Sequence, residues 1–445
     1  MSTTQLPNTT SLRPDFIWGV STSSFQIEGA AREDGRGDSI WDTYCRRGAI
    51  KDHDTGDVAC DHYHRYREDV GLMKALGVQA YRFSVAWPRI LPQGCGSANE
   101  AGLAFYDRLI DALLAAGIEP WLCLYHWDLP QALEERGGWL NRECAAWFAD
   151  YTAVVASRFC DRVKRFATLN EPSIFTLFGR SLGKRDRGSE DELHRMIHNV
   201  NLAHGAAVDA LRASVAGASI GCIHNRQPCR PSSPSEADAT AAARLNVYWN
   251  DVFPEPQCRG AYPPSIRTAI EPHMHSGDMA RICRPLDWFG LNHYSPVYVK
   301  ARADTMLGYD FADKPADVPL TPVGWPIEPE AFRQTLESVH ERYRLPIYVL
   351  ENGYGSFDQP DQMGGVNDSG RIEFLKAYIE AMNAAASSGV DVRGYFIWSL
   401  LDNFEWDSGY STRFGLTYVD YASLRRTPKA SFGWFAGLIK ARRSP

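Results

Sequence analysis

Two glutamates, Glu171 and Glu351, each stand at the end of a short apolar segment of the sequence. Two carboxyl groups that face one cleft can cleave a glycosidic bond, because one protonates the leaving oxygen while the other acts on the anomeric carbon. Carboxyls about 5 to 5.5 Å apart give retention of configuration, and a wider gap admits a water and gives inversion. The sequence does not fix this gap. Either glutamate alone could instead form a structural ion pair or cap a helix.

The neighbours of the two glutamates are expected to tune them differently. Asn170 precedes Glu171 and can bind a substrate hydroxyl beside the scissile bond. Arg82 and Tyr294 are candidates to keep Glu351 ionised, because a nearby cation and a hydrogen-bond donor both favour the charged form. Glu171 must instead stay protonated in the free protein if it is to act as an acid. The two glutamates would therefore divide the acid and nucleophile roles.

Side chains suited to a sugar stand near the ends of similar segments. Sugars present apolar C–H faces and many hydroxyls, so a sugar site needs aromatic platforms together with amide, imidazole and carboxylate partners. Both kinds occur past three different segments: Gln26, His126, Trp127, Trp398, Glu405 and Trp406. A single tryptophan is more often part of a core, but the whole group favours a carbohydrate site.

The segments that end at these residues alternate with amphipathic helices along the chain. Strands are predicted at residues 16–22, 79–87, 119–127, 165–170, 219–225, 288–294, 346–351 and 393–399. Helices are predicted at residues 63–76, 101–116, 142–159, 193–214, 330–343 and 370–386. Eight such β/α units predict an α/β fold, a single (β/α)8 TIM barrel whose long βα loops form the active-site cleft. In that fold the polar strand ends meet at one rim.

The barrel is expected to span residues 16–440, after an N-terminal tail at residues 1–15. Long stretches without helix or strand signals follow strands at residues 226–238, 300–327, 354–369 and 401–426. Loops of this length are usually lids or subsite walls. Residues 228–238 could alternatively link two domains, but strand and helix signals resume after them in the same order.

Composition and charge exclude several classes of function. The 445 residues include 47 Lys and Arg against 54 Asp and Glu, and the net charge of −7 argues against nucleic-acid binding. We expect a cytoplasmic protein that does not bind membranes, because neither a secretory signal nor an apolar run of roughly 18 residues is found. The ten cysteines form no Cys-x-x-Cys pair and are expected to be free thiols. The alternating histidines at 62 and 64, and at 273 and 275, lack a third metal ligand at suitable spacing.

Taken together, these motifs resemble glycoside hydrolase family 1, the retaining β-glucosidases and their relatives. The resemblance runs from Phe16 to about Leu438. It is carried, in order, by residues 16–22 with 26–29, 81–84 with 87–90, 125–130, 168–172, 351–353 and 398–406.

The resemblance implies a (β/α)8 barrel with Glu171 as acid/base and Glu351 as nucleophile. No metal and no organic cofactor is expected from it. It also implies a set of residues that bind the glycone hydroxyls: Gln26, His126, Asn170, Glu405 and Trp406.

The same resemblance assigns the aromatic side chains and the support of the carboxylates. Trp398 would lie under the sugar with Phe414 at its edge, and Trp325 would form an aromatic wall on the aglycone side. The two carboxylates would be supported by Arg82, Tyr294 and Asn292.

The substrates implied are small β-glycosides or short oligosaccharides: β-glucosides, with β-galactosides and β-fucosides as further candidates. Glu405 would repel a 6-phosphate, so an unphosphorylated glycone is expected, and the acid Glu171 points to O-glycosides. Two alternatives stay open: transfer of the glycosyl group to an alcohol, and a sugar-binding barrel without turnover. Assembly into a homo-oligomer also stays open.

Three positions depart from the family pattern. A shorter, basic loop at residues 179–187 is expected to alter the aglycone side of the cleft. His293 stands where a second aromatic residue is common, and Leu350 stands where threonine is frequent. Both are expected near Glu351, where they could tune the rate or the pH optimum.

Overall fold

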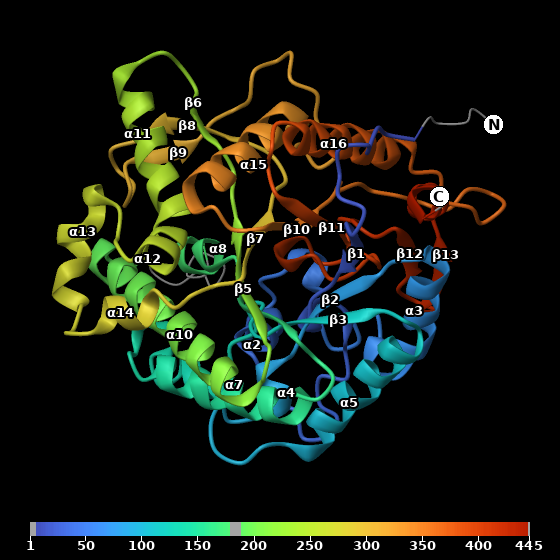
Figure 1. Ribbon diagram of the computed structural model, residues 1–445, viewed down its shortest axis with the longest axis horizontal. Helices are drawn as coiled ribbons and strands as arrows, with labels where there is room; N and C mark the ends of the chain where they lie inside the picture. The colour runs from blue at the N-terminus through green and yellow to red at the C-terminus, as the bar shows by residue number, and fades with distance from the viewer. Residues whose placement is uncertain (1–5, 179–187, 444–445) are drawn as a thin grey trace.

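A closed barrel of eight parallel strands forms the centre of the protein (Figure 1). The computed structural model describes residues 6–178 and 188–443, and the loop predicted at residues 179–187 lies outside these ranges. The strand order around the barrel is β1-β11-β10-β7-β5-β4-β3-β2. The strands are β1 Ile17–Ser21, β2 Ala80–Ser84, β3 Glu119–Cys123, β4 Arg165–Asn170, β5 Ser219–Asn225, β7 Trp288–Asn292, β10 Ile347–Asn352 and β11 Val392–Trp398. The predicted (β/α)8 barrel is confirmed, and each predicted strand is present.

Long helices surround the barrel, and each predicted helix is present. They are α3 His62–Leu76, α5 Glu100–Ala115, α7 Cys144–Phe159, α10 Glu190–Ser214, α15 Pro329–Tyr343 and α16 Ser369–Ser387. Local sequence explains some of their ends: Ser189 and Glu192 form a capping box at the start of α10, and Gly77 ends α3 with φ 81°. Among the described residues, no helix combines the length and the apolar character needed to cross a lipid bilayer.

Other helices were absent from the prediction. Between β5 and β7 lie α11 Glu236–Asn246, α12 Pro254–Arg259, α13 Pro264–Ile270 and α14 Asp278–Ile282, and after β11 comes α17 Ala430–Arg443. Three of these have five to seven residues, which is too few turns for a clear apolar period. They pack beside α10, and the last helix packs beside α3 and α16.

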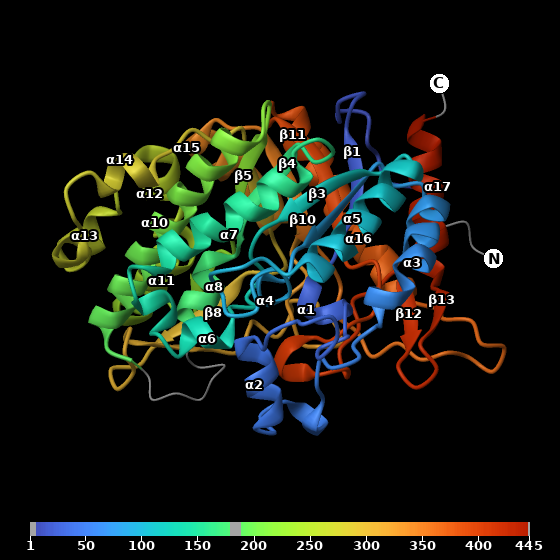
Figure 2. The same ribbon diagram turned by 90° about the horizontal axis from the view of Figure 1, so that it is seen from below.

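Short helices mark the side of the barrel where the strands end. They are α1 Ser24–Ile27, α4 Trp87–Ile90, α6 Gln131–Glu134 and α8 Pro172–Leu177. Figure 2 shows them on the lower side of the molecule, together with α2 Ile40–Arg46. The predicted strand ends at Trp87 and Trp127 were too late, because β2 stops at Ser84 and Pro88 favours the first turn of α4.

Three of the stretches predicted to be irregular contain strands. β6 Cys229–Pro231 and β9 Tyr309–Phe311 flank β8 Val297–Ala301 in a three-stranded sheet, and β12 Thr417–Asp420 pairs with β13 Arg425–Pro428. The prediction was wrong here because strands of three or four residues show little alternation and pair with distant partners. Since β6 pairs with β8, the idea of an interdomain linker at residues 228–238 is also wrong.

The barrel interior is filled by aromatic side chains. Trp121 lies 5.5 Å from Trp288 and 5.2 Å from Phe396 between ring centroids, and all three are almost fully buried. A Cβ atom at Gly19 would come within 2.3 Å of the Phe396 ring, so only glycine fits there. This packing holds the strand ends in fixed relative positions.

A buried ion cluster joins the loops that follow β10 and β11. The ammonium of Lys429 lies 2.6 Å from Oδ2 of Asp358 and 2.7 Å from Oδ1 of Asp402. Arg413 reaches the other oxygen of Asp402 at 2.8 Å. The cluster therefore ties the chain after the nucleophile candidate to the chain that carries Glu405.

Replacing Lys429 with methionine would remove the cation between two largely buried aspartates and leave each with one remaining ion pair, Asp358 with Arg371 and Asp402 with Arg413. We expect the free energy of unfolding to fall by roughly 3–5 kcal/mol, as when one partner of a buried ion pair is removed. Urea denaturation measures this change. The exposed Lys300→Met variant is the control, and equal stability of the two variants would contradict the prediction.

Candidate active site

A cavity of about 240 Å³ lies among the carboxyl ends of the barrel strands. Of the fourteen predicted site residues, ten line it: His126, Trp127, Glu171, Tyr294, Trp325, Glu351, Trp398, Glu405, Trp406 and Phe414. The other four are buried and hydrogen-bond to other site residues: Gln26, Arg82, Asn170 and Asn292. The structure thus gathers the predicted residues at one place.

Glu351 lies near the end of β10 with both carboxylate oxygens engaged. The Arg82 guanidinium donates to Oε1 at 2.6 Å, and the Tyr294 hydroxyl donates to Oε2 at 2.7 Å. Burial raises the pKa of Glu351 above its usual value, and the positive charge of Arg82 and the hydrogen bond from Tyr294 offset part of that rise. The two predicted partners thus act in favour of the charged form.

Glu171 follows β4 and has a different environment. Its Oε1 accepts hydrogen bonds from the Asn292 amide at 2.8 Å and from the Asn225 amide at 2.9 Å. Burial, followed by the negative charge of Glu351, raises the pKa of Glu171 to about 8. A carboxyl group with this pKa is protonated at neutral pH, as a general acid must be.

Both glutamates that line the cavity lie at or next to an irregularity in the strand pairing. The pairing of β4 with β5 shifts register between Ala167 and Asn170, and the pairing of β10 with β7 shifts between Val349 and Glu351. Such irregularities turn the side chains that follow them. Glu171 has φ 52°, a left-handed conformation that is strained for a side chain of this size. Backbone strain of this kind gathers at functional sites.

Arg82 also organises the polar wall beside Glu351. Its second terminal nitrogen donates to Oδ1 of Asn170 at 2.5 Å and lies 3.3 Å from Nδ1 of His126. The Asn170 amide lies 3.2 Å from Nε2 of the same histidine. Burial, and then the charge of Arg82, hold the pKa of His126 well below its usual range. The imidazole is therefore neutral.

Glu405 is a third carboxyl group in the lining of the cavity, and it accepts a hydrogen bond from Gln26. The Gln26 amide donates to the carbonyl of Phe404 at 2.8 Å and to Oε2 of Glu405 at 3.3 Å. Burial, and then the charge of Glu351, raise the pKa of Glu405 to about 8. Trp406, next along the chain, stacks on Trp127 with ring centroids 4.7 Å apart.

Aromatic rings form the remaining walls. Trp398, Tyr294 and Phe414 make a buried cluster, and the Trp398 ring stacks 5.7 Å from His126. Trp325 lies 5.4 Å from Tyr294 and is 38% exposed, so it stands at the open side of the cavity.

Sequence reasoning missed some lining residues: Ile174, Phe178, Asn225, Gln227 and Trp249. Asn225 holds Glu171, and the Trp249 indole donates to Oδ1 of Asn225 at 3.0 Å. The signal for Asn225 was present, because it ends the predicted fifth strand. Trp249 lies in a π-helical turn at Val247–Asp251 that no pattern in the sequence indicates.

His293 and Leu350, the two departures from the family pattern near Glu351, make contacts within the fold. The His293 backbone N–H donates to the Glu351 carbonyl at 3.0 Å, while its ring lies 2.8 Å from the carbonyl oxygen of Arg226. Leu350 packs into the barrel interior. Any effect of either side chain on the chemistry would therefore be indirect.

A family model described as glycosyl hydrolase family 1 matches residues 8–444. The chain belongs to glycosyl hydrolase family 1. Beta-glucosidase A of Thermotoga maritima is 44% identical over 433 residues, which cover 96% of this chain and 97% of that one. A bifunctional beta-D-glucosidase/beta-D-fucosidase of Bifidobacterium breve is 42% identical, covering 95% of this chain and 97% of its own.

Solved structures of family 1 agree with the fold. A beta-glucosidase from Thermotoga maritima in complex with glucoimidazole superimposes with a TM-score of 0.91 at 43% identity. The match covers 97% of this chain and 99% of the other. The family predicted from the motifs is thus confirmed.

The environment of Glu171 predicts the pH dependence of catalysis. As pH rises through the pKa of about 8, Glu171 loses its proton, so kcat/KM should fall there. Asn225→Ala removes a donor that favours the carboxylate, so this alkaline limb should move to higher pH. Steady-state rates across the pH range measure the limb. Gln227→Ala, which removes an amide from the same cavity without touching Glu171, should leave it in place; an equal shift in both variants would refute the assignment.

Proposed function

We propose that this chain is a retaining exo-β-glucosidase, which hydrolyses the terminal β-D-glucosyl residue of O-glucosides. One observation carries the proposal: the two glutamates at the strand ends, Glu171 and Glu351, share a cavity, and of these two Glu351 alone forms an ion pair with a buried guanidinium. Such a pair divides into a nucleophile and an acid. The names of the relatives, β-glucosidases among them, support glucose as the glycone.

In the first step, Glu351 attacks the anomeric carbon while Glu171 gives its proton to the leaving oxygen. The carboxylate of Glu351 becomes an ester, so Arg82 loses the negative charge that it faced. The pKa of Glu171 should fall at the same moment, because the charge of Glu351 is one of the causes that raise it.

In the second step, Glu171 takes a proton from a water that attacks the anomeric carbon of the glycosyl-enzyme. The fall in its pKa suits this change of role from acid to base. The product keeps the β configuration because each step inverts the anomeric carbon once.

The part of the cavity lined by His126, Trp398 and Glu405 is the proposed glycone site. Gln26, His126 and Glu405 supply amide, imidazole and carboxyl groups for the sugar hydroxyls, and Trp398 supplies an aromatic face. We propose that β-fucosides and β-galactosides are also accepted. Among the described residues that line the cavity, none is lysine or arginine, so a 6-phosphate would find no cation there.

We also propose a cytoplasmic location. All ten cysteines lie within the described residues, and none is in a disulfide. Unpaired cysteines in this number are typical of a reducing compartment.

Substitution of the two glutamates tests the assigned roles. Glu351→Gln should lower kcat roughly a thousandfold or more, because no covalent intermediate forms. Glu171→Ala should lose roughly 10²–10⁴ in rate on poor leaving groups and regain activity on dinitrophenyl β-glucoside with azide, which needs no general base.

The readouts are steady-state rates and the configuration of the first product by NMR, which should be β-glucose and, with azide, β-glucosyl azide. The exposed Glu341→Gln variant is the control and should behave like the unmodified protein. Unchanged turnover in Glu351→Gln, or α-glucose as first product, would rule out the mechanism.

A panel of p-nitrophenyl glycosides tests the glycone. We expect hydrolysis of the β-glucoside, β-fucoside and β-galactoside. The 6-phospho-β-glucoside should react at least roughly a hundredfold more slowly, because a buried, unpaired phosphate is costly. Comparable kcat/KM values on the phosphorylated and unphosphorylated β-glucosides would contradict this prediction.

A further inference from the structure

The carboxyl group of Glu171 accepts hydrogen bonds on one of its two oxygens. Asn292 and Asn225 both donate to Oε1, at 2.8 and 2.9 Å. No described residue forms a hydrogen bond to Oε2. A carboxyl oxygen has two lone pairs, so an oxygen that already accepts two N–H groups has no place left for a proton. The two oxygens of the acid are therefore not equivalent.

A cation fixes the direction of the Asn292 amide. The Arg82 guanidinium can only donate, so the side-chain oxygen of Asn170 faces it, at 2.5 Å. The same oxygen lies 3.1 Å from Nδ2 of Asn292, and this contact is favourable only when Asn292 turns its NH2 group that way. That NH2 group is also the one that faces Glu171. The donor-only character of Arg82 thus passes through two amides to Oε1.

An indole fixes the direction of the second amide. The ring N–H of Trp249 can also only donate, and it lies 3.0 Å from Oδ1 of Asn225. The NH2 group of Asn225 then points the other way, to Glu171. Asn225 is 4% exposed and Trp249 is 7% exposed, so a rotated amide would leave a buried indole N–H facing an NH2 group. Leaving a buried donor without an acceptor is costly.

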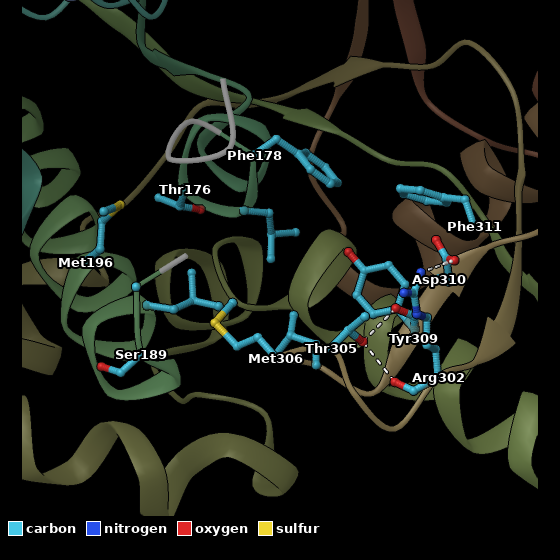
Figure 3. A pocket seen from close by; sticks show the side chains of 14 residues that line it. Thr176, Phe178, Ser189, Met196, Arg302, Thr305, Met306, Tyr309, Asp310 and Phe311 are labelled. Atoms are coloured by element: carbon cyan, nitrogen blue, oxygen red, sulfur yellow. Dashed lines mark hydrogen bonds and ion pairs between the residues drawn. The ribbon is translucent and has the colours of Figure 1, made fainter. Parts of the chain in front are cut away.

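Contacts of Trp249 and of its neighbour hold the indole in this place. The Trp249 ring lies 5.2 Å from the ring of Phe178 and 6.3 Å from that of Phe311. Figure 3 shows these two phenylalanine side chains at the edge of a neighbouring cavity. The Asn250 amide donates to the carbonyl of Gln227 at 2.9 Å, and its side-chain oxygen accepts from the Gln227 N–H at 3.1 Å. These two bonds join the π-helical turn of Trp249 to the loop that follows β5.

We infer that Trp249 is a positioning residue for the acid: through Asn225, its indole N–H keeps the acidic proton on Oε2 of Glu171. The inference rests on the retaining mechanism proposed above and deepens it, because it names the group that decides which oxygen gives its proton to the leaving group. The same oxygen takes the proton of the attacking water in the second step.

Other titratable groups also interact with Glu171: Glu351, Glu405, Arg82 and Tyr294. After burial, the charge of Glu351 raises the pKa of Glu171, while the charge of Arg82 lowers it. A replacement at Trp249 leaves all of these groups in place. A change in the pH dependence would therefore report the amide of Asn225.

Loss of the indole N–H would let Asn225 turn its carbonyl toward Glu171 and accept the acid's proton from Oε1. That proton would no longer be on the oxygen that serves the leaving group. Substrates that need protonation should then react more slowly, whereas those with a good leaving group should not. The new hydrogen bond would also favour the neutral form of Glu171, so the alkaline limb of kcat/KM should move to higher pH.

The test replaces Trp249 by benzothienylalanine, which keeps the shape of tryptophan and has sulfur in place of the ring N–H. For n-propyl β-glucoside, kcat/KM should fall roughly tenfold, a factor that one hydrogen bond can carry. For dinitrophenyl β-glucoside it should equal that of the unmodified protein. The alkaline limb, measured with the propyl glucoside, should move to higher pH.

The same replacement at Trp288 is the matched control. Trp288 is 1% exposed in the barrel interior, and its ring N–H has no hydrogen-bond partner among the described residues. Loss of that N–H should change the rate on neither substrate. Asn225→Ala gives a second comparison. Adding the replacement of Trp249 to it should move the alkaline limb no further, because the indole acts through that amide.

Neutron diffraction of the deuterium-exchanged protein locates the proton without any substrate. At a pH below the pKa of Glu171, we expect deuterium on Oε2 of Glu171, and the ND2 group of Asn225 facing Oε1. Deuterium on Oε1, or the carbonyl of Asn225 facing Glu171, would overturn the inference.

The kinetic outcomes separate this inference from the proposed function. An unchanged dependence on the leaving group after replacement of Trp249 would overturn the inference alone. Additive shifts of the alkaline limb with Asn225→Ala would do the same. No hydrolysis of dinitrophenyl β-glucoside by the unmodified protein would instead overturn the proposed function.

Discussion

The buried contact between Arg82 and Glu351 is the interaction on which the rest of the site depends. Burial favours the neutral form of both glutamates, so without a cation neither carboxyl group would readily ionise. Arg82 contacts Glu351 directly, so its charge opposes the effect of burial more strongly there than at Glu171. The charge that it stabilises there then raises the pKa of Glu171 further. One ion pair therefore makes the surroundings of the two carboxyl groups differ, and two further side chains, Asn170 and His126, lie within hydrogen-bond distance of the same guanidinium.

The barrel supplies this arrangement because its strands cannot move independently. Arg82 comes from β2, Asn170 from β4, Asn292 from β7 and Glu351 from β10, so the site draws on strands around most of the ring. An interior filled by Trp121, Trp288 and Phe396 resists any change in the spacing of those strands. The ion cluster at Lys429 extends the same rigidity to the loop that carries Glu405.

The parts that the sequence predicted are those with local signals. Strand and helix periods repeat in each β/α unit, and Glu171 and Glu351 stand at strand ends where that fold places its chemistry. The sheet of β6, β8 and β9 was missed because its strands are short and its partners are distant in sequence. Asn225 was overlooked although it too ends a strand. The pKa of Glu171 and the contact between Phe178 and Trp249 depend on burial and on contacts between separate loops, which no local pattern encodes.

The two ends of the site recognise their ligands by different physics. At the glycone end, buried polar groups such as Gln26 and Glu405 would be left unpaired by a sugar that lacks a matching hydroxyl, and sites of this kind can discriminate by 10⁴-fold or more. At the aglycone end, Trp325, Phe178 and Trp249 offer apolar surface, where one methylene changes binding by only about 10- to 200-fold at most. Selectivity in this chain should therefore be strict for the sugar and graded for the group attached to it, because unpaired polar groups are costlier than imperfect apolar contact.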